Sequence, residues 1–153
     1  MWHINARKCL KLFDKVYISS DSDDILREAK ELGCLAIKRP KVLCGDTPNI
    51  YVYLHAFGYM DADRIVAVQA NSPTVSEQII KTIKEFIDLG IPEAITVNPD
   101  YSIYGSVWGF SKEVVFNYKD PYHPTPMVQI IDTSKDIHSL EDLQMALIEY
   151  NTK

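Results

Sequence analysis

Short apolar runs alternate with amphipathic stretches along most of this chain. Runs of β-branched and aromatic residues predict strands at 15–19, 34–38, 65–69, 94–97, 104–110 and 128–132. Apolar residues spaced three and four apart predict helices at about 25–32, 49–59, 75–89, 111–116 and 140–150. A loop rich in aromatic residues and proline is expected over 117–126. This alternation is typical of a single α/β domain, residues 1–153, with a mostly parallel sheet.

Polar residues beside the apolar runs predict where helices begin. Thr47, which precedes a proline, has the pattern of an N-cap. Thr74 and Glu77 have capping-box spacing, and Ser72 is an alternative cap in the same segment. Ser139 and the acidic residue three positions later repeat that spacing before the last helix.

The segment Gln69–Pro73, with the sequence QANSP, directly follows a predicted buried strand. Open α/β sheets bind ligands at the carboxyl ends of their strands, and the N-terminus of a following helix favours negative charge. Amide and hydroxyl groups here could therefore bind a polar ligand. They could equally do no more than cap the helix, and the pattern alone leaves both interpretations open.

Composition narrows the range of functions. The chain has 153 residues, 46% of them hydrophobic and 24% charged, and a formal net charge of −5. An acidic protein without a basic face is not expected to bind nucleic acid, and no apolar run approaches the roughly 20 residues that cross a membrane. The three cysteines are scattered and odd in number, which is typical of reduced thiols in the cytoplasm.

Five sequence blocks occur in an order and at distances that resemble one enzyme family. They are VYISSDSDDILREAKELG, KRPKVLCGDTPN, IVAVQANSPTVSEQI, YGSVWGF and DIHSLEDLQMA. Together they resemble the acylneuraminate cytidylyltransferases, the CMP-sialic acid synthetase family, and their sugar-nucleotidyltransferase relatives. The resemblance implies a Rossmann-like three-layer nucleotidyltransferase fold, a homodimer and a place in the biosynthesis of cell-surface polysaccharides.

The resemblance also implies an activity. Enzymes of this family transfer CMP from CTP to a sialic-acid-like or related sugar acid and release pyrophosphate, with Mg²⁺ neutralising the phosphates; Mn²⁺ is the alternative metal. A sugar hydroxyl attacks the α-phosphorus, so positioning and electrostatics are expected to do most of the catalytic work. No individual catalytic residue can be named from the sequence.

Three residues match the family's nucleotide-binding blocks. Arg39 matches the arginine of an Arg-Pro block, and a guanidinium there would suit a phosphate or a base edge. Asp46 and Thr47 match the Asp-Thr pair that follows in the family, although helix capping explains Thr47 equally well. For Arg39 the alternative is a surface arginine that holds its loop.

Gln69, Asn71, Ser72 and Gly105 match the family's sugar-binding blocks. The family sequence Gln-Pro-Thr-Ser-Pro is Gln-Ala-Asn-Ser-Pro here, which keeps hydrogen-bonding groups and reshapes the pocket. The acceptor is therefore expected to differ from a standard sialic acid. Gly105 precedes the family's sugar-site strand, where backbone approaches a ligand closely; a β-bulge is the other explanation.

Asp136 and His138 stand where the family has an Asp-Ile-Asp metal site. Carboxylates suit Mg²⁺, whereas imidazole suits Mn²⁺, Zn²⁺ or iron better. The change to His138 predicts a weakened or altered metal site, and a surface histidine without a ligand role is an equal alternative. Asp132 could supply a carboxylate in its place.

The first residues depart most from the family. Met1–Lys8 resembles the helix that follows the family's first strand and its triphosphate-binding loop, so that strand and loop are expected to be missing. No Walker or GxGxxG sequence replaces them, which predicts weak CTP affinity. The alternatives are a non-catalytic relative that binds a sugar acid or a protein partner, and a plain α/β interaction domain. Exposed strand edges would favour pairing with another chain.

Overall fold

We analysed a computed structural model, which describes residues 1–118 and 128–152, and the side chains only as far as residue 148. In chain order the elements are α1 (Trp2–Leu12), β1 (Tyr17–Ser20), α2 (Asp23–Glu31), β2 (Leu35–Lys38), η1 (Lys41–Leu43), α3 (Asn49–Phe57), β3 (Arg64–Val68), α4 (Glu77–Asp88), β4 (Glu93–Val97), β5 (Ile103–Ser111), α5 (Lys112–Asn117), β6 (Val128–Ile131) and α6 (Leu140–Thr152). Residues 119–126 of the predicted proline-rich loop lie outside the described part.

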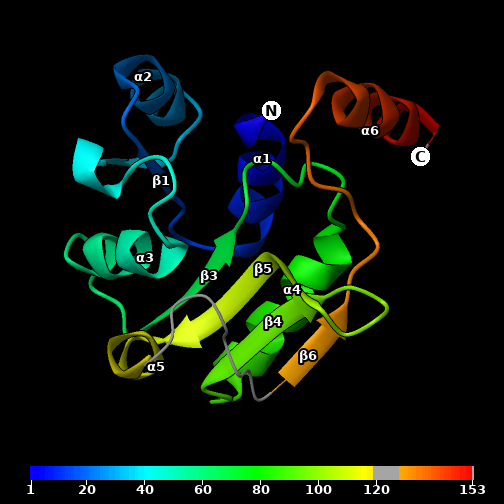
Figure 1. The fold of residues 1–153 in the computed structure, drawn as a ribbon. Coiled ribbons are helices and arrows are strands. Elements are labelled where there is room, and N and C mark those ends of the chain that lie inside the picture. The colour runs from blue at the N-terminus through cyan, green and yellow to red at the C-terminus, as the bar shows by residue number, and fades with distance from the viewer. Residues whose placement is uncertain (119–127, 153) are drawn as a thin grey trace.

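The strands form two separate sheets (Figure 1). β1 and β2 make a parallel pair, and the other four strands make a sheet in the order β3-β5-β4-β6. Within the larger sheet β5 is antiparallel to both β3 and β4, whereas β6 is parallel to β4. The prediction of a mostly parallel sheet is therefore wrong, because the larger sheet is mixed. The parallel character holds for the β1–β2 pair.

Helices cover both faces of the four-stranded sheet, which gives three layers. Ile80, Ile83 and Ile87 of α4 pack with Val107 on one face. On the opposite face the buried residues of α3 and α5 pack against Trp108 and other strand residues. A third, smaller cluster joins α1 and α2 to the β1–β2 pair. None of the described helices is long and apolar enough to cross a membrane.

A glycine lets α4 lie very close to the sheet. A Cβ atom added at Gly109 would meet Ile83 Cγ2 and Ile87 Cγ1, each at 2.6 Å. Atoms this close would repel strongly, so any side chain here would push α4 away from β5. The second glycine of the YGSVWGF strand is therefore needed for packing in the core.

Serine residues cap four helices, but not always where the sequence predicted. Ser22, Ser76 and Ser111 each accept a hydrogen bond from the third backbone N–H of the helix that follows. α4 thus begins at Glu77 after Ser76, and the predicted caps at Ser72 and Thr74 are wrong, as is the capping box at Thr74. Thr74 Oγ1 instead accepts from the distant backbone N–H of Lys135. The cap at Ser139 is confirmed by its reciprocal bonds with Asp142.

Candidate functional site at the carboxyl ends of the strands

The turn after β3 is held against α1 by two polar side chains. Asn5 Nδ2 donates to the carbonyl of Gln69 at 2.8 Å and to that of Ser72 at 3.0 Å. Lys8 Nζ donates to two carbonyls farther along the same turn, each at 2.7 Å. These bonds satisfy backbone acceptors that no regular element pairs, and they hold the backbone of the turn against α1. The polar segment after the strand is therefore not part of helix α4.

The segment before α6 brings Asp136 onto the same turn. Asp136 Oδ1 accepts from Ser72 Oγ, and from Tyr104 Oη at 3.1 Å. The backbone N–H of Ile137 donates to the carbonyl of Asn71 at 2.8 Å. Burial raises the pKa of Tyr104 to about 12, so its phenol stays protonated at neutral pH and remains a donor. Two predicted sugar-binding residues, Asn71 and Ser72, and one predicted metal-binding residue, Asp136, therefore lie in segments that contact each other.

Asp132 is a buried carboxylate next to the group formed by Ser72, Tyr104 and Asp136. It is 2% exposed and accepts hydrogen bonds from the Ser106 hydroxyl and from both the N–H and the hydroxyl of Ser134. Ser134 Oγ also lies 3.4 Å from Tyr104 Oη, which links Asp132 to the Asp136 group. A buried carboxylate with three donors is already satisfied. Asp132 therefore has a structural role: it holds Ser106 and Ser134 in place, and its carboxylate is not exposed to solvent.

The metal-binding potential of the site is limited. Asp136 Oδ2 lies 3.6 Å from Nε2 of the exposed His138. Among the described residues, no three His, Cys, Asp or Glu side chains are grouped so that they could hold a metal ion. Mg²⁺ often uses one or two carboxylates together with substrate phosphates. Asp136 fits that kind of site, in which the substrate supplies most of the ligands.

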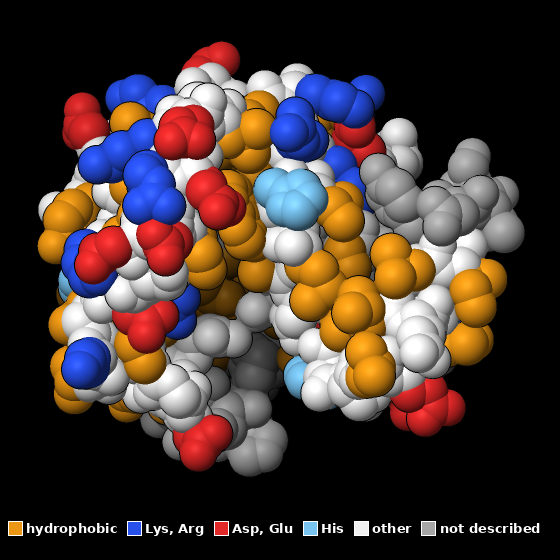
Figure 2. Space-filling model, turned by 90° about the horizontal axis from the view of Figure 1, so that it is seen from above, with side chains coloured by type: hydrophobic (Ala, Val, Ile, Leu, Met, Phe, Trp, Pro, Cys, Tyr) orange, Lys and Arg blue, Asp and Glu red, His pale blue; other side chains and the backbone are white. Residues whose placement is uncertain are grey.

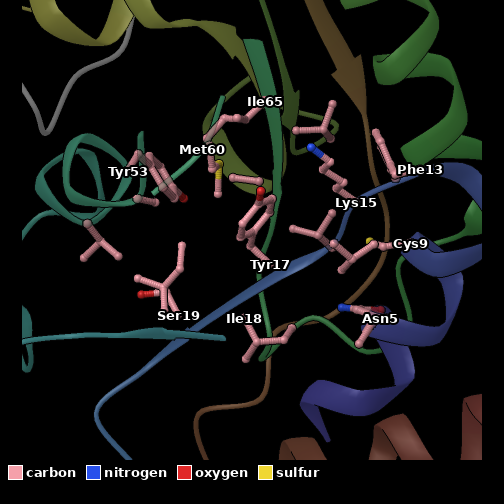
Figure 3. A pocket seen from close by; sticks show the side chains of 18 of the residues that line it. Asn5, Cys9, Phe13, Lys15, Tyr17, Ile18, Ser19, Tyr53, Met60 and Ile65 are labelled. Atoms are coloured by element: carbon pink, nitrogen blue, oxygen red, sulfur yellow. The ribbon is translucent and has the colours of Figure 1, made fainter. Parts of the chain in front are cut away.

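A second polar group lies beside the turn, at one end of a cavity of about 660 Å³ (Figure 3). Arg39 Nη2 donates to the Ser19 carbonyl at 2.8 Å, and Gln69 Nε2 donates to Tyr53 Oη at 3.3 Å. Burial raises the pKa of Tyr53, and the charge of Arg39 partly opposes that shift. Arg39 Nε is buried without a hydrogen-bond partner. This end of the cavity therefore offers guanidinium and amide donors to an anionic or polar ligand.

The remaining predicted residues lie elsewhere. Asp46 is exposed, and Thr47 Oγ1 donates to the carbonyls of Val42 and Cys44 at 3.1 Å each. Thr47 therefore closes the loop around η1 and does not cap α3, whose N-cap is Pro48. Gly105 lies inside β5 with φ of +71°, near a register shift between β4 and β5. A β-bulge accounts for that glycine.

Sequence reasoning missed the residues that position the site. Asn5 and Lys8 lie three residues apart on α1, and Lys8 Nζ also donates to Asn5 Oδ1 at 3.1 Å. The signal that could have indicated them is the position of two polar residues beside Ala6 and Cys9 on the buried side of the helix.

The three layers, together with a polar site at the strand ends, define an α/β nucleotidyltransferase-like fold. Over 99% of this chain it is similar to the structure of CMP:2-keto-3-deoxy-manno-octonic acid synthetase complexed with CTP, with a TM-score of 0.72 at 11% identity over 88% of that chain. It is also similar to the manganese complex of Rv0371c from Mycobacterium tuberculosis, with a TM-score of 0.67 at 14% identity over 96% of this chain and 85% of that one.

The cytidylyltransferase family model matches residues 1–90, and this chain belongs to that family. It is 31% identical over 72 residues to the 3-deoxy-manno-octulosonate cytidylyltransferase of Nitratiruptor sp.. That match covers 47% of this chain and 30% of the relative, so the matched region spans less than a third of the relative's length.

Proposed function

We propose that this chain carries the substrate-binding part of a cytidylyltransferase that joins CMP from CTP to a sugar acid and releases pyrophosphate. The observation that supports this most directly is the hydrogen-bonded group of Ser72, Tyr104 and Asp136 at the turn after β3, which follows directly on Gln69 in the lining of the cavity. Family membership supports the reaction class. The name of the curated relative favours a 3-deoxy-octulosonate-like acid, and a sialic-acid-like acceptor is the second candidate for the same site.

The proposed roles follow from the positions of the donors. Arg39 neutralises phosphate charge, since a guanidinium pairs well with phosphate oxygens and its Nε has no protein partner. Gln69 and Asn71 hydrogen-bond the sugar acid, while Ser72 and Tyr104 orient the Asp136 carboxylate through their hydrogen bonds. Holding a sugar hydroxyl in line with the α-phosphorus would lower the barrier mainly by orientation.

A divalent cation, Mg²⁺ or Mn²⁺, would be held by Asp136 together with substrate phosphates, and His138 would favour Mn²⁺. Such an ion supplies charge neutralisation at the phosphates. The roles of Asp46, Thr47 and Gly105 in binding stay predictions, as do the homodimer and the cytoplasmic location. For Asp46 and Thr47, the nucleotide would have to reach the loop around η1.

Calorimetric titration with CTP, in Mg²⁺ and again in Mn²⁺, tests the nucleotide site. We expect Arg39→Ala to lower CTP affinity at least about tenfold, because a charge-assisted hydrogen bond contributes roughly 1.5–3 kcal/mol. Arg27→Ala is the matched control, since Arg27 is an exposed helix residue paired with Asp24. An equal effect of both substitutions would show that Arg39 does not contact the nucleotide.

A pyrophosphate-release assay with a panel of sugar acids then tests the reaction. Asp136→Asn keeps an acceptor for Ser72 and Tyr104 while removing the charge, so turnover should fall more than sugar-acid affinity does. Sugar-acid binding that Gln69→Ala weakens, without any CTP binding, would support the non-catalytic relative. Absence of both kinds of binding would overturn the proposed function.

A further inference from the structure

Residues 132–138 lead from the end of β6 to α6 and carry Asp136 (Figure 1). We call them the Asp136 segment. The segment starts at the carboxyl ends of β4 and β6, because the N–H of Asp132 donates to the Val97 carbonyl at 2.9 Å and extends the pairing of these parallel strands. Seen from above, the molecule is hollowed near the centre of the view (Figure 2). A ligand can therefore approach the strand ends from this side.

The hydroxyl of Thr74 holds the residue next to Asp136. Thr74 is 9% exposed, and its Oγ1 accepts a hydrogen bond from the backbone N–H of Lys135 at 3.0 Å. The turn that carries Thr74 is itself fixed, because Asn5 Nδ2 donates to the Ser72 carbonyl at 3.0 Å. One buried hydroxyl thus joins the Asp136 segment to a turn that α1 holds in place.

Asp132 holds the segment from the other side. Its Oδ1 accepts the backbone N–H of Ser134 at 2.9 Å, and its Oδ2 accepts the Ser134 hydroxyl at 2.7 Å. Ser134 Oγ lies 3.4 Å from Tyr104 Oη, and Tyr104 in turn donates to Asp136. The buried Asp132 carboxylate therefore acts on Asp136 along two routes, through the backbone of the segment and through the Tyr104 hydroxyl.

The two carboxylate oxygens of Asp136 have different surroundings. Oδ1 accepts hydrogen bonds from the hydroxyls of Ser72 and Tyr104. Oδ2 lies 3.6 Å from Nε2 of His138, whose side chain is 74% exposed. Two donors on Oδ1 oppose rotation of the carboxylate, so Oδ2 keeps one direction in which it can meet a cation. Contacts of this kind around a metal ligand strongly affect metal affinity.

We propose that Thr74 and Asp132 are positioning residues: they hold the Asp136 segment so that Asp136 Oδ2 binds the divalent cation that accompanies CTP. This inference rests on the proposed function, because it requires a cation at Asp136. Neither Thr74 nor Asp132 has to contact a substrate, and each acts through hydrogen bonds to the segment.

The first test measures Mn²⁺ binding in the presence of CTP by electron paramagnetic resonance, in which the signal of dissolved Mn²⁺ is lost on binding. Thr74→Val keeps the shape of the side chain and removes its hydroxyl, so Mn²⁺ affinity should fall about tenfold. Thr74→Ser keeps the hydroxyl and should bind Mn²⁺ about as tightly as the unmodified protein. Ser76→Ala is the matched control, since the Ser76 hydroxyl also accepts one backbone N–H, that of Ile79 in α4 at 3.1 Å.

Hydrogen exchange of the backbone amides gives a readout that does not depend on Mn²⁺. Exchange at Lys135 and Ile137 should be faster in Thr74→Val than in Thr74→Ser, because the segment loses one of its anchors. Ser76→Ala should increase exchange at the start of α4 and leave the segment unchanged. Far-UV circular dichroism checks that each variant is folded.

A second substitution tests the other anchor. Asp132→Asn leaves one acceptor oxygen where the carboxylate has two, so it cannot accept from both the backbone N–H and the hydroxyl of Ser134 as well as from Ser106. Mn²⁺ affinity should fall about tenfold, as it should in Thr74→Val. Unchanged affinity in Asp132→Asn would remove Asp132 from the proposal.

The remaining outcomes separate this inference from the proposed function. Mn²⁺ binding that Asp136→Asn abolishes and Thr74→Val leaves unchanged would overturn the inference and leave the proposed function standing. Equal losses in Thr74→Val and Ser76→Ala would also overturn it, because reduced stability would then explain both. Mn²⁺ binding that survives Asp136→Asn, or no binding by the unmodified protein, would overturn the cation site of the proposed function as well.

Discussion

β4 and β3 belong to the same sheet, yet their surroundings differ sharply. All five residues of β4 are buried, and the strand pairs with β5 on one side and β6 on the other. Among the strands that the structure describes, β3 pairs only with β5, and four of its five residues are partly exposed although helices cover both of its faces. Burial in this fold therefore depends on lateral strand pairing as well as on covering helices. The side with β4 carries the fully buried strand, and the side with β3 carries the cavity and the candidate site.

The sharpest test of this comparison uses one substitution on both strands. Ile95 of β4 is 1% exposed and Ile65 of β3 is partly exposed, and both pack in the same cluster with Trp108 and Phe110. Ile95→Ala should lower the free energy of unfolding by about 3–4 kcal/mol, and Ile65→Ala by about 1–2 kcal/mol. Urea denaturation measures both. Equal losses would show that Ile65 is packed as tightly as Ile95, which would break the comparison.

The second test concerns α1, whose residue Lys8 holds the turn after β3. Lys8→Met should cost about 2 kcal/mol, because two carbonyls in the turn after β3 lose a charged donor. Lys11→Met is the control on the same helix. Lys11 is 65% exposed and pairs with the partly exposed Glu77, so its loss should cost about 0.5 kcal/mol. Hydrogen exchange in residues 69–75 should increase only in the Lys8 variant. Similar exchange in both variants would show that Lys8 does not hold the turn.

The elements themselves could be predicted because periodicity is local. Every predicted strand and helix is present within a few residues, since β-branched runs and three-to-four spacing record which side of each segment is buried. The length of a connection also indicates the direction of β5. Only five residues separate Val97 of β4 from Ile103 of β5, whereas a parallel connection needs a dozen or more. The short connection therefore requires an antiparallel pair.

The site was harder to predict because its contacts join distant segments. Gln69, Ser72 and Asp136 were predicted through the family resemblance; in the structure Ser72 is hydrogen-bonded to Asp136, whereas Gln69 lines the adjoining cavity. The partners that hold them were not found: Ser72 meets Asp136 across 64 residues, and Asn5 reaches the Gln69 carbonyl across a similar separation. Thr74 had a local capping pattern, yet its hydroxyl bonds Lys135. Such long-range pairings leave no periodic signal in the sequence.

The prediction with the smallest expected effect concerns Glu93, a buried acidic residue of the fully buried strand β4. Glu93 of β4 is 5% exposed and accepts hydrogen bonds from Trp108 Nε1 at 2.8 Å and from Tyr118 Oη. Loss of hydration raises the pKa of Glu93 above its ordinary value, and the two hydrogen bonds only partly offset this shift. The folded state thus holds the Glu93 proton more tightly than the unfolded chain does.

The contribution of Glu93 to the free energy of unfolding is therefore complete at pH values below its ordinary pKa. This contribution is lost as the pH rises through the raised pKa of the folded state. Glu93→Gln keeps an acceptor without the charge, so relative to the unmodified protein its free energy of unfolding should increase between pH 4 and pH 7, by less than about 1 kcal/mol. Urea denaturation at both pH values measures the difference, and Glu31→Gln controls for the loss of one exposed negative charge. A relative stability that falls over this pH range would mean that water or a cation reaches Glu93. The surroundings of β4 would then be more accessible to solvent than the burial of its five residues indicates.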